Sequence, residues 1–530
     1  MTEKPLIRSA TIMSIATFFS RIAGLIREQA FAYFFGAGAW TDAFNIAFRI
    51  PNLLRDLFAE GAMSAAFVPT FNSFLKKEGK EKAFRLMGLT LNVLLMIVGF
   101  LSILGIIFSP EIVKLLAPGF ADNKEKFDIT VTMTRIMFPF LLVISWSAVA
   151  MGGLNSLGEF FVPAVAPVFL NLSMIFAGFT LCPLAAKAGY PEITGMAVGA
   201  MIGGFLQMAV QFPWLFRHGF KFQKELGFSD EGVRKIAWLI VPGTMGLAAT
   251  QLNVAISTIL ATSQGDGAVS WLGYAFRLMQ LPLGIFGVSV AQASLPVFSR
   301  QAADKDVEGM KNTFSSSLKL TAFINIFACL FLIVCAEPII RLLFEHGRFT
   351  PSDTAATVDA LRAYSIGLFT FSAVKVMAPA FYALNDPATP LKASIVTVIA
   401  NISLNLLFIA PLGYKGLALA TSLASLVNAA ILYMSMSKKL PGLSEKGIMR
   451  SIAFAVVCSA FMAVGLHYFV VHSDQYFIGL CGKIAGSALT VSFSLIIGAL
   501  FFFLLANIFR VEEAKKVTEI LIKKISGKRK

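Results

Sequence analysis

Residues 17–69 read TFFSRIAGLIREQAFAYFFGAGAWTDAFNIAFRIPNLLRDLFAEGAMSAAFVP, and this stretch decides the fold class. It is apolar enough to enter a bilayer, yet it carries the charged residues Arg21, Arg27, Glu28, Asp42, Arg49, Arg55, Asp56 and Glu60. An arginine at the bilayer centre costs roughly 2.5–3.5 kcal/mol on insertion scales, so a passive anchor would gain nothing from several of them. We therefore expect these side chains to face a water-filled cavity and to hold an anionic group there.

The remainder of the chain has the composition of an integral membrane protein. Of its 530 residues, 57% are hydrophobic and 14% are charged, whereas a soluble protein keeps about 25% charged residues. The formal net charge of +15 resides in short clusters between apolar runs, which is where the positive-inside rule places basic residues. This distribution argues against a nucleic-acid partner, because no soluble basic domain is available to contact phosphates.

Apolar runs long enough to cross a hydrocarbon core of about 30 Å predict an all-α polytopic membrane protein with about fourteen transmembrane helices. The approximate spans are 10–35, 41–74, 86–117, 129–153, 160–184, 193–216, 235–262, 268–298, 314–343, 356–384, 390–410, 415–437, 449–471 and 479–508. Basic residues precede the first span, follow the second, sixth and twelfth, and fill the C-terminal tail. Both termini are therefore expected on the cytoplasmic side.

An internal repeat relates the two halves of the chain. The tripeptide AFR ending at Arg49 recurs as AFR ending at Arg277, and Arg135 matches Arg362, at offsets near 228 residues. An offset that spans six helices relates halves of the same topology, so the repeat is parallel, about an axis along the membrane normal. We predict two six-helix lobes, an appendage of two C-terminal helices, and a basic cytoplasmic tail helix, at residues 1–225, 226–440, 441–510 and 511–530.

Several of the intramembrane charges have two interpretations. Structural ion pairing, the usual fate of charges in a membrane, competes with substrate binding for Arg27, Glu28, Asp56 and Glu60. Binding is favoured for Arg21, Arg55 and Arg277, whose helices show fewer obvious acidic partners, and we expect these three to line one central cavity between the lobes. Pro51 and the group Pro282, Gly284 and Gly287 are expected to bend or weaken their helices.

The residue types themselves favour an anionic ligand. Arg277 lies in the otherwise apolar segment SWLGYAFRLMQLPLG, at the repeat-equivalent position of Arg49. Guanidinium groups bind phosphate oxygens bidentately and stay charged at any physiological pH. Lys375 adds a further intramembrane cation, for which snorkelling to the interface is the alternative.

Signals for an enzyme are weak. The five cysteines form no CxxC pair, the four histidines have no metal-ligand spacing, and no Walker, GxSxG or HExxH motif occurs. The segment Asp304–Asp306 imitates a glycosyltransferase metal motif but has no nucleotide-binding domain around it. We predict a transporter with no catalytic residues, no metal and no cofactor, and the sequence leaves a coupling cation open.

The chain resembles the MurJ (MviN) family, lipid II flippases of the multidrug/oligosaccharidyl-lipid/polysaccharide exporter superfamily. The resemblance covers nearly the whole chain and is most specific in FSRIAGLIRE, GAGAWTDAFNIAFRIPNLLRDLFAEGAMSAAFVP, APGF, SWLGYAFRLMQLPLGIFGV and KVMAPAFY. It associates function with Arg21, Arg27, Asp42, Arg55 and Arg277. The chain departs from the family where Glu28 replaces a familiar aspartate, and where Phe276 and Gln280 stand at positions that are acidic in some members. The resemblance therefore does not extend to the acidic residues that some members carry beside Arg277.

The resemblance implies a flippase that carries lipid II, an undecaprenyl-pyrophosphoryl disaccharide-pentapeptide used in peptidoglycan and cell-wall biogenesis, across the bacterial inner membrane. It also implies a groove in the last two helices that houses a lipid tail, and a protein that works as a monomer. The combined set of substrate-binding candidates is Arg21, Arg27, Asp42, Arg49, Arg55, Arg277 and Lys375. The alternatives are a flippase for another polyprenyl-linked glycan, a MATE-like antiporter of drugs or cations, and a membrane-embedded glycosyltransferase.

Overall fold

The computed structural model describes residues 3–56, 63–443, 445–509 and 511–515, and gives no side-chain description for residues 3–18, 65 and 241–250. The described residues form helices without strands, which confirms the all-α prediction. They divide into two compact units, Met1–Ser270 and Trp271–Lys530. The sequence predicts a lobe boundary after residue 225, whereas the structure groups α12 (Glu231–Thr262) with the first unit because it packs along α3 (Met63–Lys77).

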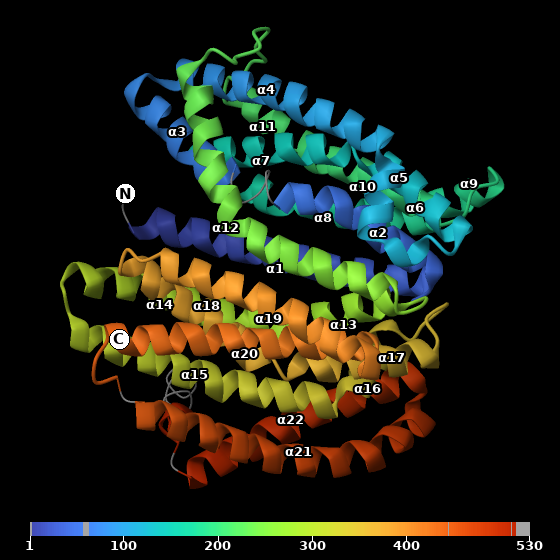
Figure 1. The fold of residues 1–530 in the computed structure, drawn as a ribbon, viewed down its shortest axis with the longest axis vertical. Coiled ribbons are helices and arrows are strands. Elements are labelled where there is room, and N and C mark those ends of the chain that lie inside the picture. Colours follow the sequence, from blue (N-terminus) through green and yellow to red (C-terminus); the bar gives the residue numbers. More distant parts are fainter. Residues whose placement is uncertain (1–2, 57–62, 444, 510, 516–530) are drawn as a thin grey trace. The chain divides into compact units, whose positions relative to one another are not determined.

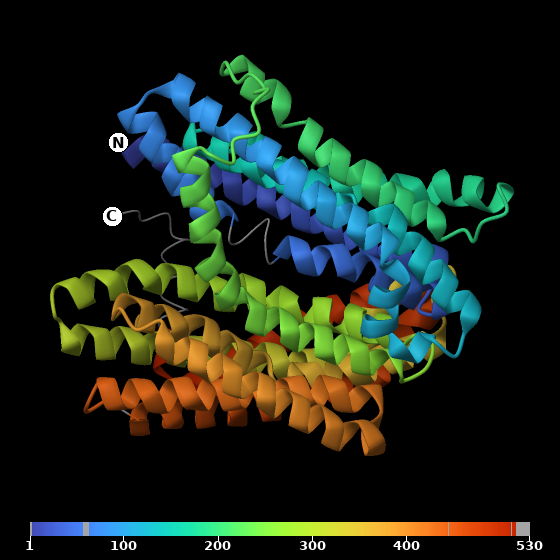
Figure 2. The same cartoon turned by 45° about the horizontal axis from the view of Figure 1, so that its top comes forward.

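The first unit consists of eleven α-helices besides α12. They are α1 (Glu3–Phe35), α2 (Ala39–Leu54), α3, α4 (Lys80–Ile107), α5 (Ser109–Leu116), α6 (Lys124–Met137), α7 (Phe140–Ser156), α8 (Phe161–Phe179), α9 (Leu181–Lys187), α10 (Thr194–Ala209) and α11 (Phe212–Arg217), with the 3₁₀ turn η2 (Pro118–Phe120) after α5. Figure 1 and Figure 2 show α4 lying alongside α7 in this unit. The core beneath them includes Phe67, Phe71 and Met87, all fully buried.

The second unit is also built of helices and ends in a helical hairpin. Its helices are α13 (Ala268–Pro282, which begins in the first unit), the π-helical η3 (Leu283–Gly287), α14 (Val288–Ala303), α15 (Val307–Val334), α16 (Ala336–Phe344), α17 (Pro351–Ser365), α18 (Leu368–Ala383), α19 (Ala388–Leu412), α20 (Tyr414–Lys439), α21 (Glu445–Cys481) and α22 (Lys483–Ile508). Figure 1 shows α21 and α22 side by side, and α21 packs on α15. The two helices turn at Gly482, whose φ of 80° favours glycine.

Matching contacts support the internal repeat. The guanidinium Nε of Arg135 donates to the carbonyl of Ile106 at 3.3 Å, and that of Arg362 donates to the carbonyl of Ile333 at 3.2 Å. Both bonds cross 29 positions, and the two arginines are 227 positions apart (362 minus 135). Helices α4 and α15, which supply these carbonyls, are both 28 residues long. The repeated motif was therefore a correct sign of a repeated supersecondary structure.

The number of spans differs from the prediction. Among the described residues, ten helices are long and apolar enough to cross a membrane, or eleven if one pair bent by 43° counts as a single span. The predicted count of fourteen is not confirmed. The other three predicted spans, 10–35, 41–74 and 235–262, all contain residues whose side chains or backbone lie outside the description.

Several predicted helix boundaries were wrong. The predicted span 86–117 is broken at Phe108 between α4 and α5, and 314–343 is broken at Cys335 between α15 and α16. Pro110 and Pro338 follow these breaks within the first turn of the next helix. Proline lacks a backbone N–H and is tolerated there but not in a helix interior, so it starts a new helix instead of extending the old one.

Candidate functional site

The first group of candidate residues lies on α1. Arg21 is exposed, whereas Arg27 and Glu28 are largely buried and form an ion pair with each other. This is the structural pairing that the sequence left open as one of two interpretations. A guanidinium already neutralised by an adjacent carboxylate presents less net charge to a ligand than Arg21 does.

The second group lies near the end of α2. Arg55 donates to Asp56 through its Nη2 at 2.9 Å, and Asp56 also accepts a bond of 3.1 Å from the amide of Gln251 on α12. Arg49, which lies earlier on α2, interacts electrostatically with both Asp56 and Arg55. Its Nε is buried and has no hydrogen-bond partner among the described residues. A buried donor without a partner costs free energy, so Arg49 is suited to receive an acceptor from a ligand.

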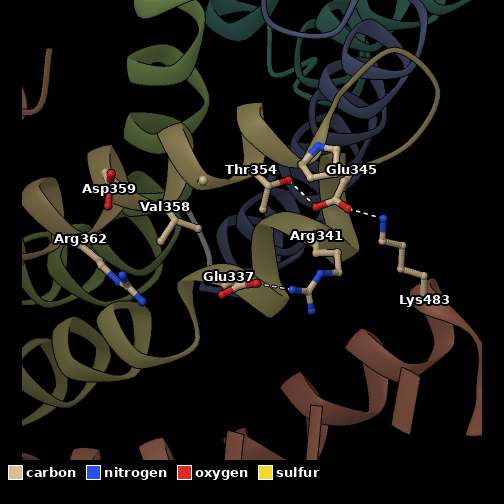
Figure 3. Close-up of a pocket in the computed structure, with 10 residues that line it drawn as sticks. Glu337, Arg341, Glu345, Thr354, Val358, Asp359, Arg362 and Lys483 are labelled. Carbon is tan, nitrogen blue, oxygen red and sulfur yellow. Dashed lines mark hydrogen bonds and ion pairs between the residues drawn. The ribbon is translucent and has the colours of Figure 1, made fainter. Parts of the chain in front are cut away.

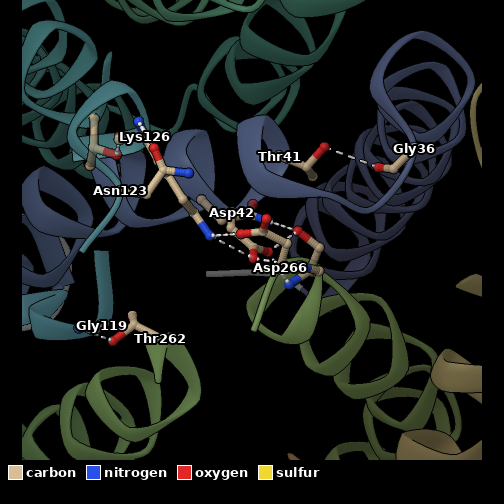
Figure 4. A network of polar contacts seen from close by, with 12 residues as sticks. Gly36, Thr41, Asp42, Gly119, Asn123, Lys126, Thr262 and Asp266 are labelled. Carbon is tan, nitrogen blue, oxygen red and sulfur yellow. Dashed lines mark hydrogen bonds and ion pairs between the residues drawn. The ribbon is translucent and has the colours of Figure 1, made fainter. Parts of the chain in front are cut away.

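Asp42, near the start of α2, occupies a different environment. Its side chain is 0% exposed, and its two oxygens accept from four donors. Figure 4 shows Asp42 beside Lys126 and Asp266. The donors are Lys126 Nζ at 3.4 Å, the Gly267 amide at 2.7 Å, the Ser270 amide at 2.9 Å and the Ser270 hydroxyl at 2.6 Å. Asp42 has no accessible surface in this conformation, and its contacts join the segment after α12 to α2. Its predicted role in substrate binding stays a prediction.

Lys126, on α6, completes what we call the Asp42 network. It is 3% exposed, donates to Asp266 at 2.7 Å and lies 3.9 Å from the centroid of the Phe120 ring. Sequence reasoning missed both residues, because Lys126 lies in the first turn of α6 within a segment of balanced charge and Asp266 lies in a nearly neutral loop. A buried lysine shared between two carboxylates is costly to leave unpaired, so Asp42, Lys126 and Asp266 are coupled in stability.

A close backbone approach supports the same region. The amide of Gly119, in η2, donates to the hydroxyl of Thr262, the last residue of α12, at 3.3 Å (Figure 4). A Cβ at Gly119 would lie 2.3 Å from the carbonyl oxygen of Thr262 and 2.7 Å from the amide nitrogen of Ser263. Only glycine allows the two chain segments to meet in this way.

We therefore expect Gly119→Ala to lower the free energy of unfolding by about 1–3 kcal/mol, the usual cost of overpacking against backbone atoms that cannot rotate away. Thermal or denaturant unfolding of the purified protein in detergent measures it. Gly99→Ala is the matched control, because Gly99 lies in α4 with nothing within 4 Å of its Cβ position. Equal stability of the two variants would contradict the close approach.

The candidates of the second unit lie on α13 and α18. Arg277 and Gln280 are exposed on α13, Lys375 is exposed on α18, and Phe276 packs against Tyr364 with ring centroids 5.3 Å apart. The weakened helix predicted around Pro282, Gly284 and Gly287 is confirmed, since residues Leu283–Gly287 are π-helical. A π-helical turn in a helix often marks a functional site, and this one directly follows the helix that carries Arg277.

The structure thus groups Arg27 with Glu28, and Arg49 and Arg55 with Asp56, within the first unit. These five side chains carry three positive and two negative charges, and the exposed Arg21 adds a fourth positive charge on α1. Glu60 lies outside the described residues. The predicted cavity shared by Arg21, Arg55 and Arg277 stays a prediction.

Known proteins are similar to this chain over most of its length. The family model described as "Lipid II flippase MurJ" matches residues 31–509. The probable lipid II flippase MurJ of Vibrio cholerae is 37% identical over 441 residues, which is 82% of this chain and 83% of that protein. The lipid II flippase MurJ of Burkholderia cenocepacia is 33% identical, over 88% of this chain and 91% of that protein.

Solved structures give the same result. A lipid II flippase MurJ in an inward closed conformation superposes with a TM-score of 0.78 at 28% identity, over 94% of this chain and 98% of that one. An inward-facing MATE-family multidrug transporter of the MOP superfamily reaches 0.65 at 15% identity, over 82% of this chain and 99% of that one, and shows the shared fold alone. With a family model that matches 31–509 and relatives above 30% identity across most of its length, the chain belongs to the lipid II flippase MurJ family.

Proposed function

We propose that this multi-pass inner-membrane protein is a transporter that moves lipid II from the cytoplasmic to the periplasmic leaflet by alternating access. The observation that carries the proposal is family membership over residues 31–509. The cargo is anionic at its pyrophosphate, and the membrane-embedded α1, α2 and α13 carry Arg21, Arg49, Arg55 and Arg277, whose guanidinium groups suit phosphate oxygens.

The polar contacts suggest a division of labour among these arginines. Arg27 is paired with Glu28, and Arg55 is paired with Asp56. These carboxylates neutralise part of the positive charge that the two arginines would present to a ligand. Arg49 has a buried Nε without a partner among the described residues, and Arg21 and Arg277 are exposed. We assign first contact with the pyrophosphate to Arg21, Arg49 and Arg277, and assign positioning to the paired arginines and Asp42. Lys375 remains a further candidate contact.

The charge balance disfavours a cationic cargo of the kind that a MATE-like antiporter would export. Such a cargo would require accessible carboxylates, but the described carboxylates Glu28, Asp42 and Asp56 are each engaged by a cation or by hydrogen-bond donors. Another polyprenyl-linked glycan shares the pyrophosphate and is separated from lipid II only by assay. The proposal also includes cytoplasmic termini, function as a monomer, no cofactor, no nucleic-acid partner and a lipid-tail groove in α21 and α22.

Depletion of the protein in cells, with the leaflet of the precursor followed over time, tests the proposed function. We expect lipid II to accumulate on the cytoplasmic side and to reach the periplasmic side again when the parent protein is restored. The purified protein in vesicles should move lipid II faster than another polyprenyl-pyrophosphate glycan. Precursor that reaches the periplasmic leaflet at the normal rate after depletion would contradict the proposal.

We expect the inside-negative membrane potential to help drive export, because an anionic pyrophosphate moves outward down the field. The gain is about 2.3 kcal/mol per charge per 100 mV if the charge crosses the whole field, which corresponds to roughly a fortyfold change in the equilibrium ratio between leaflets. Arginines that travel with the pyrophosphate would cancel part of this charge, whereas static arginines would leave it intact.

The measurement is flipping in vesicles or cells while the potential is collapsed at a constant pH gradient. A reduced rate or a reduced final ratio is the expected result. Unchanged flipping would mean that the pyrophosphate crosses as a neutral complex or that an ion gradient supplies the work, and the arginines would then serve recognition alone.

A further inference from the structure

A charged pocket of about 420 Å³ lies in the second unit, where α16, α17 and the start of α22 meet (Figure 3). Its charged lining consists of Glu337, Arg341, Glu345, Asp359, Arg362 and Lys483. The charge distribution of the sequence predicts that these helix ends face the periplasm. None of these residues belongs to the proposed pyrophosphate site.

Most of these charges already have partners. The Nζ of Lys483 lies 2.5 Å from a carboxylate oxygen of Glu345. The other oxygen of Glu345 accepts a hydrogen bond of 2.5 Å from the Thr354 hydroxyl. Burial would raise the pKa of Glu345, but the hydrogen bonds from Lys483 and Thr354 and the positive charges of Lys483 and Arg341 lower it below its ordinary value. Asp359 lies 2.5 Å from Lys415. These pairs form the fixed part of the pocket wall.

Two positions depart from this pairing. Arg341 is shared by two carboxylates, Glu337 and Asp474, so one negative charge there is not fully compensated. Arg362 has no carboxylate within ion-pair distance among the described residues, and its recorded bond is the one from Nε to the carbonyl of Ile333. The pocket therefore presents a spare positive group at Arg362 and a spare negative group at Glu337. Figure 3 shows these two side chains extending toward the same space.

The internal repeat separates the structural role of Arg362 from a binding role. Arg135 makes the same Nε bond to the carbonyl of Ile106 in the first unit. However, the repeat-equivalent positions of Glu337, Glu345 and Asp359 are occupied by Pro110, Pro118 and Thr132, and Lys483 belongs to a hairpin that has no counterpart there. The bond from the arginine Nε to the carbonyl at the helix end forms in both units. It therefore does not require Glu337, Glu345, Asp359 or Lys483, and we assign these residues an additional purpose.

The surroundings of the pocket are apolar. Leu480 and Ile484, on either side of Lys483, are 66% and 58% exposed. In a membrane protein, exposed apolar side chains beside a charged helix end contact acyl chains near the headgroup level. A ligand that reaches this pocket thus arrives with a polar head and an apolar tail.

We propose that this pocket binds a compact zwitterion, with an acidic group on Arg362 and a primary ammonium on Glu337, and that its source is the headgroup of a phosphoethanolamine lipid. A guanidinium and a phosphate form strong charge-assisted bonds. The ammonium compensates the charge of Glu337, whose partner Arg341 is also paired with Asp474. The same chemistry, an acid with an amine, occurs in the peptide of the precursor, and that second source rests on the proposed function.

The test is titration of the purified full-length protein in detergent with short-chain phosphatidylethanolamine, phosphatidylcholine and phosphatidylglycerol, with binding read by native mass spectrometry. We expect phosphatidylethanolamine to bind best and Arg362→Gln to weaken it by about tenfold or more, the effect of losing a charge-assisted bond. Arg135→Gln is the matched control, because it removes the equivalent Nε bond, and it should bind as the parent does. Glu337→Gln should abolish the preference for phosphatidylethanolamine over phosphatidylglycerol.

A second arm distinguishes the sources. The free precursor peptide is added as a competitor of the bound lipid. Displacement of the lipid from the parent but not from Arg362→Gln shows that the pocket binds the zwitterion of the cargo peptide. No displacement shows that the pocket binds the lipid headgroup. Equal binding by Arg362→Gln and Arg135→Gln, or no preference for an ammonium headgroup, overturns the proposal. Flipping by Arg362→Gln is recorded separately, so that failure of the pocket and failure of the proposed function give different results.

Discussion

Replacement of Arg277 by lysine is expected to reduce lipid II flipping by about tenfold to a hundredfold, although the charge is kept. Lysine offers a point charge in place of the planar fork that binds two phosphate oxygens at once. Loss of one hydrogen bond to a charged group costs about 1.5–3 kcal/mol, and each 1.4 kcal/mol corresponds to a factor of ten. The side chain is exposed on α13, so the change should leave folding intact.

The measurement is growth of a depletion strain that expresses the variant at the normal level, together with flipping in vesicles. Arg300→Lys is the control, since Arg300 lies in the last turn of α14 and outside the candidate set. We expect the control to support growth and Arg277→Lys to fail at parental expression. Growth of Arg277→Lys equal to that of the parent would refute the pyrophosphate role of Arg277.

Replacement of Asp42 by asparagine is expected to lower the free energy of unfolding by about 3 kcal/mol. The amide keeps the shape of the side chain but removes the charge that Lys126 faces in a fully buried site, and breaking a buried pair by neutralising one partner typically costs 3–5 kcal/mol. We expect the lower end of that range, because Lys126 keeps its bond of 2.7 Å to Asp266. Flipping should fall as well, since Gly267 and Ser270 lose a charged acceptor.

Unfolding of the purified protein, combined with a double-mutant cycle, measures this effect. Lys126→Met alone should also destabilise, and the double variant Asp42→Asn with Lys126→Met should lose less than the sum, with a coupling of about 0.5–3 kcal/mol. Asp128→Asn on α6 is the control, because Asp128 is exposed, and its effect should stay within about 0.5 kcal/mol. Additive single effects would show that the two side chains are not coupled.

The main lines of the fold could be predicted from the sequence. Hydropathy identified the helices, because every membrane helix must bury its backbone polar groups internally and cover itself with apolar side chains. The matching motifs around Arg135 and Arg362 correctly indicated a repeat, because each half preserves the same bond to a helix-end carbonyl. The weak point in the helix after Arg277 followed from Pro282 with Gly284 and Gly287, since proline cannot donate to the turn before it and glycine is a poor helix former.

The candidate site could be predicted only in part. The sequence singled out the arginines because a charge inside an apolar run is conspicuous, but it could not decide which of them are paired. Arg27 with Glu28 and Arg55 with Asp56 are adjacent in sequence, and only the helix geometry and the contact with Gln251 show that these carboxylates are engaged. Local spacing does not determine which neighbouring charges meet.

The sequence by itself determined an all-helical membrane protein with a repeated half and an excess of intramembrane arginine, because these properties follow from composition and periodicity along the chain. Tertiary structure alone decided the roles of Asp42, Lys126 and Asp266. Lys126 lies 84 positions from Asp42 and 140 positions from Asp266, and each looks like an ordinary charge at a helix end. They become a network only when packing brings the three together and removes water from Asp42 and Lys126, while Asp266 stays exposed. That desolvation depends on contacts between distant segments that no local pattern contains.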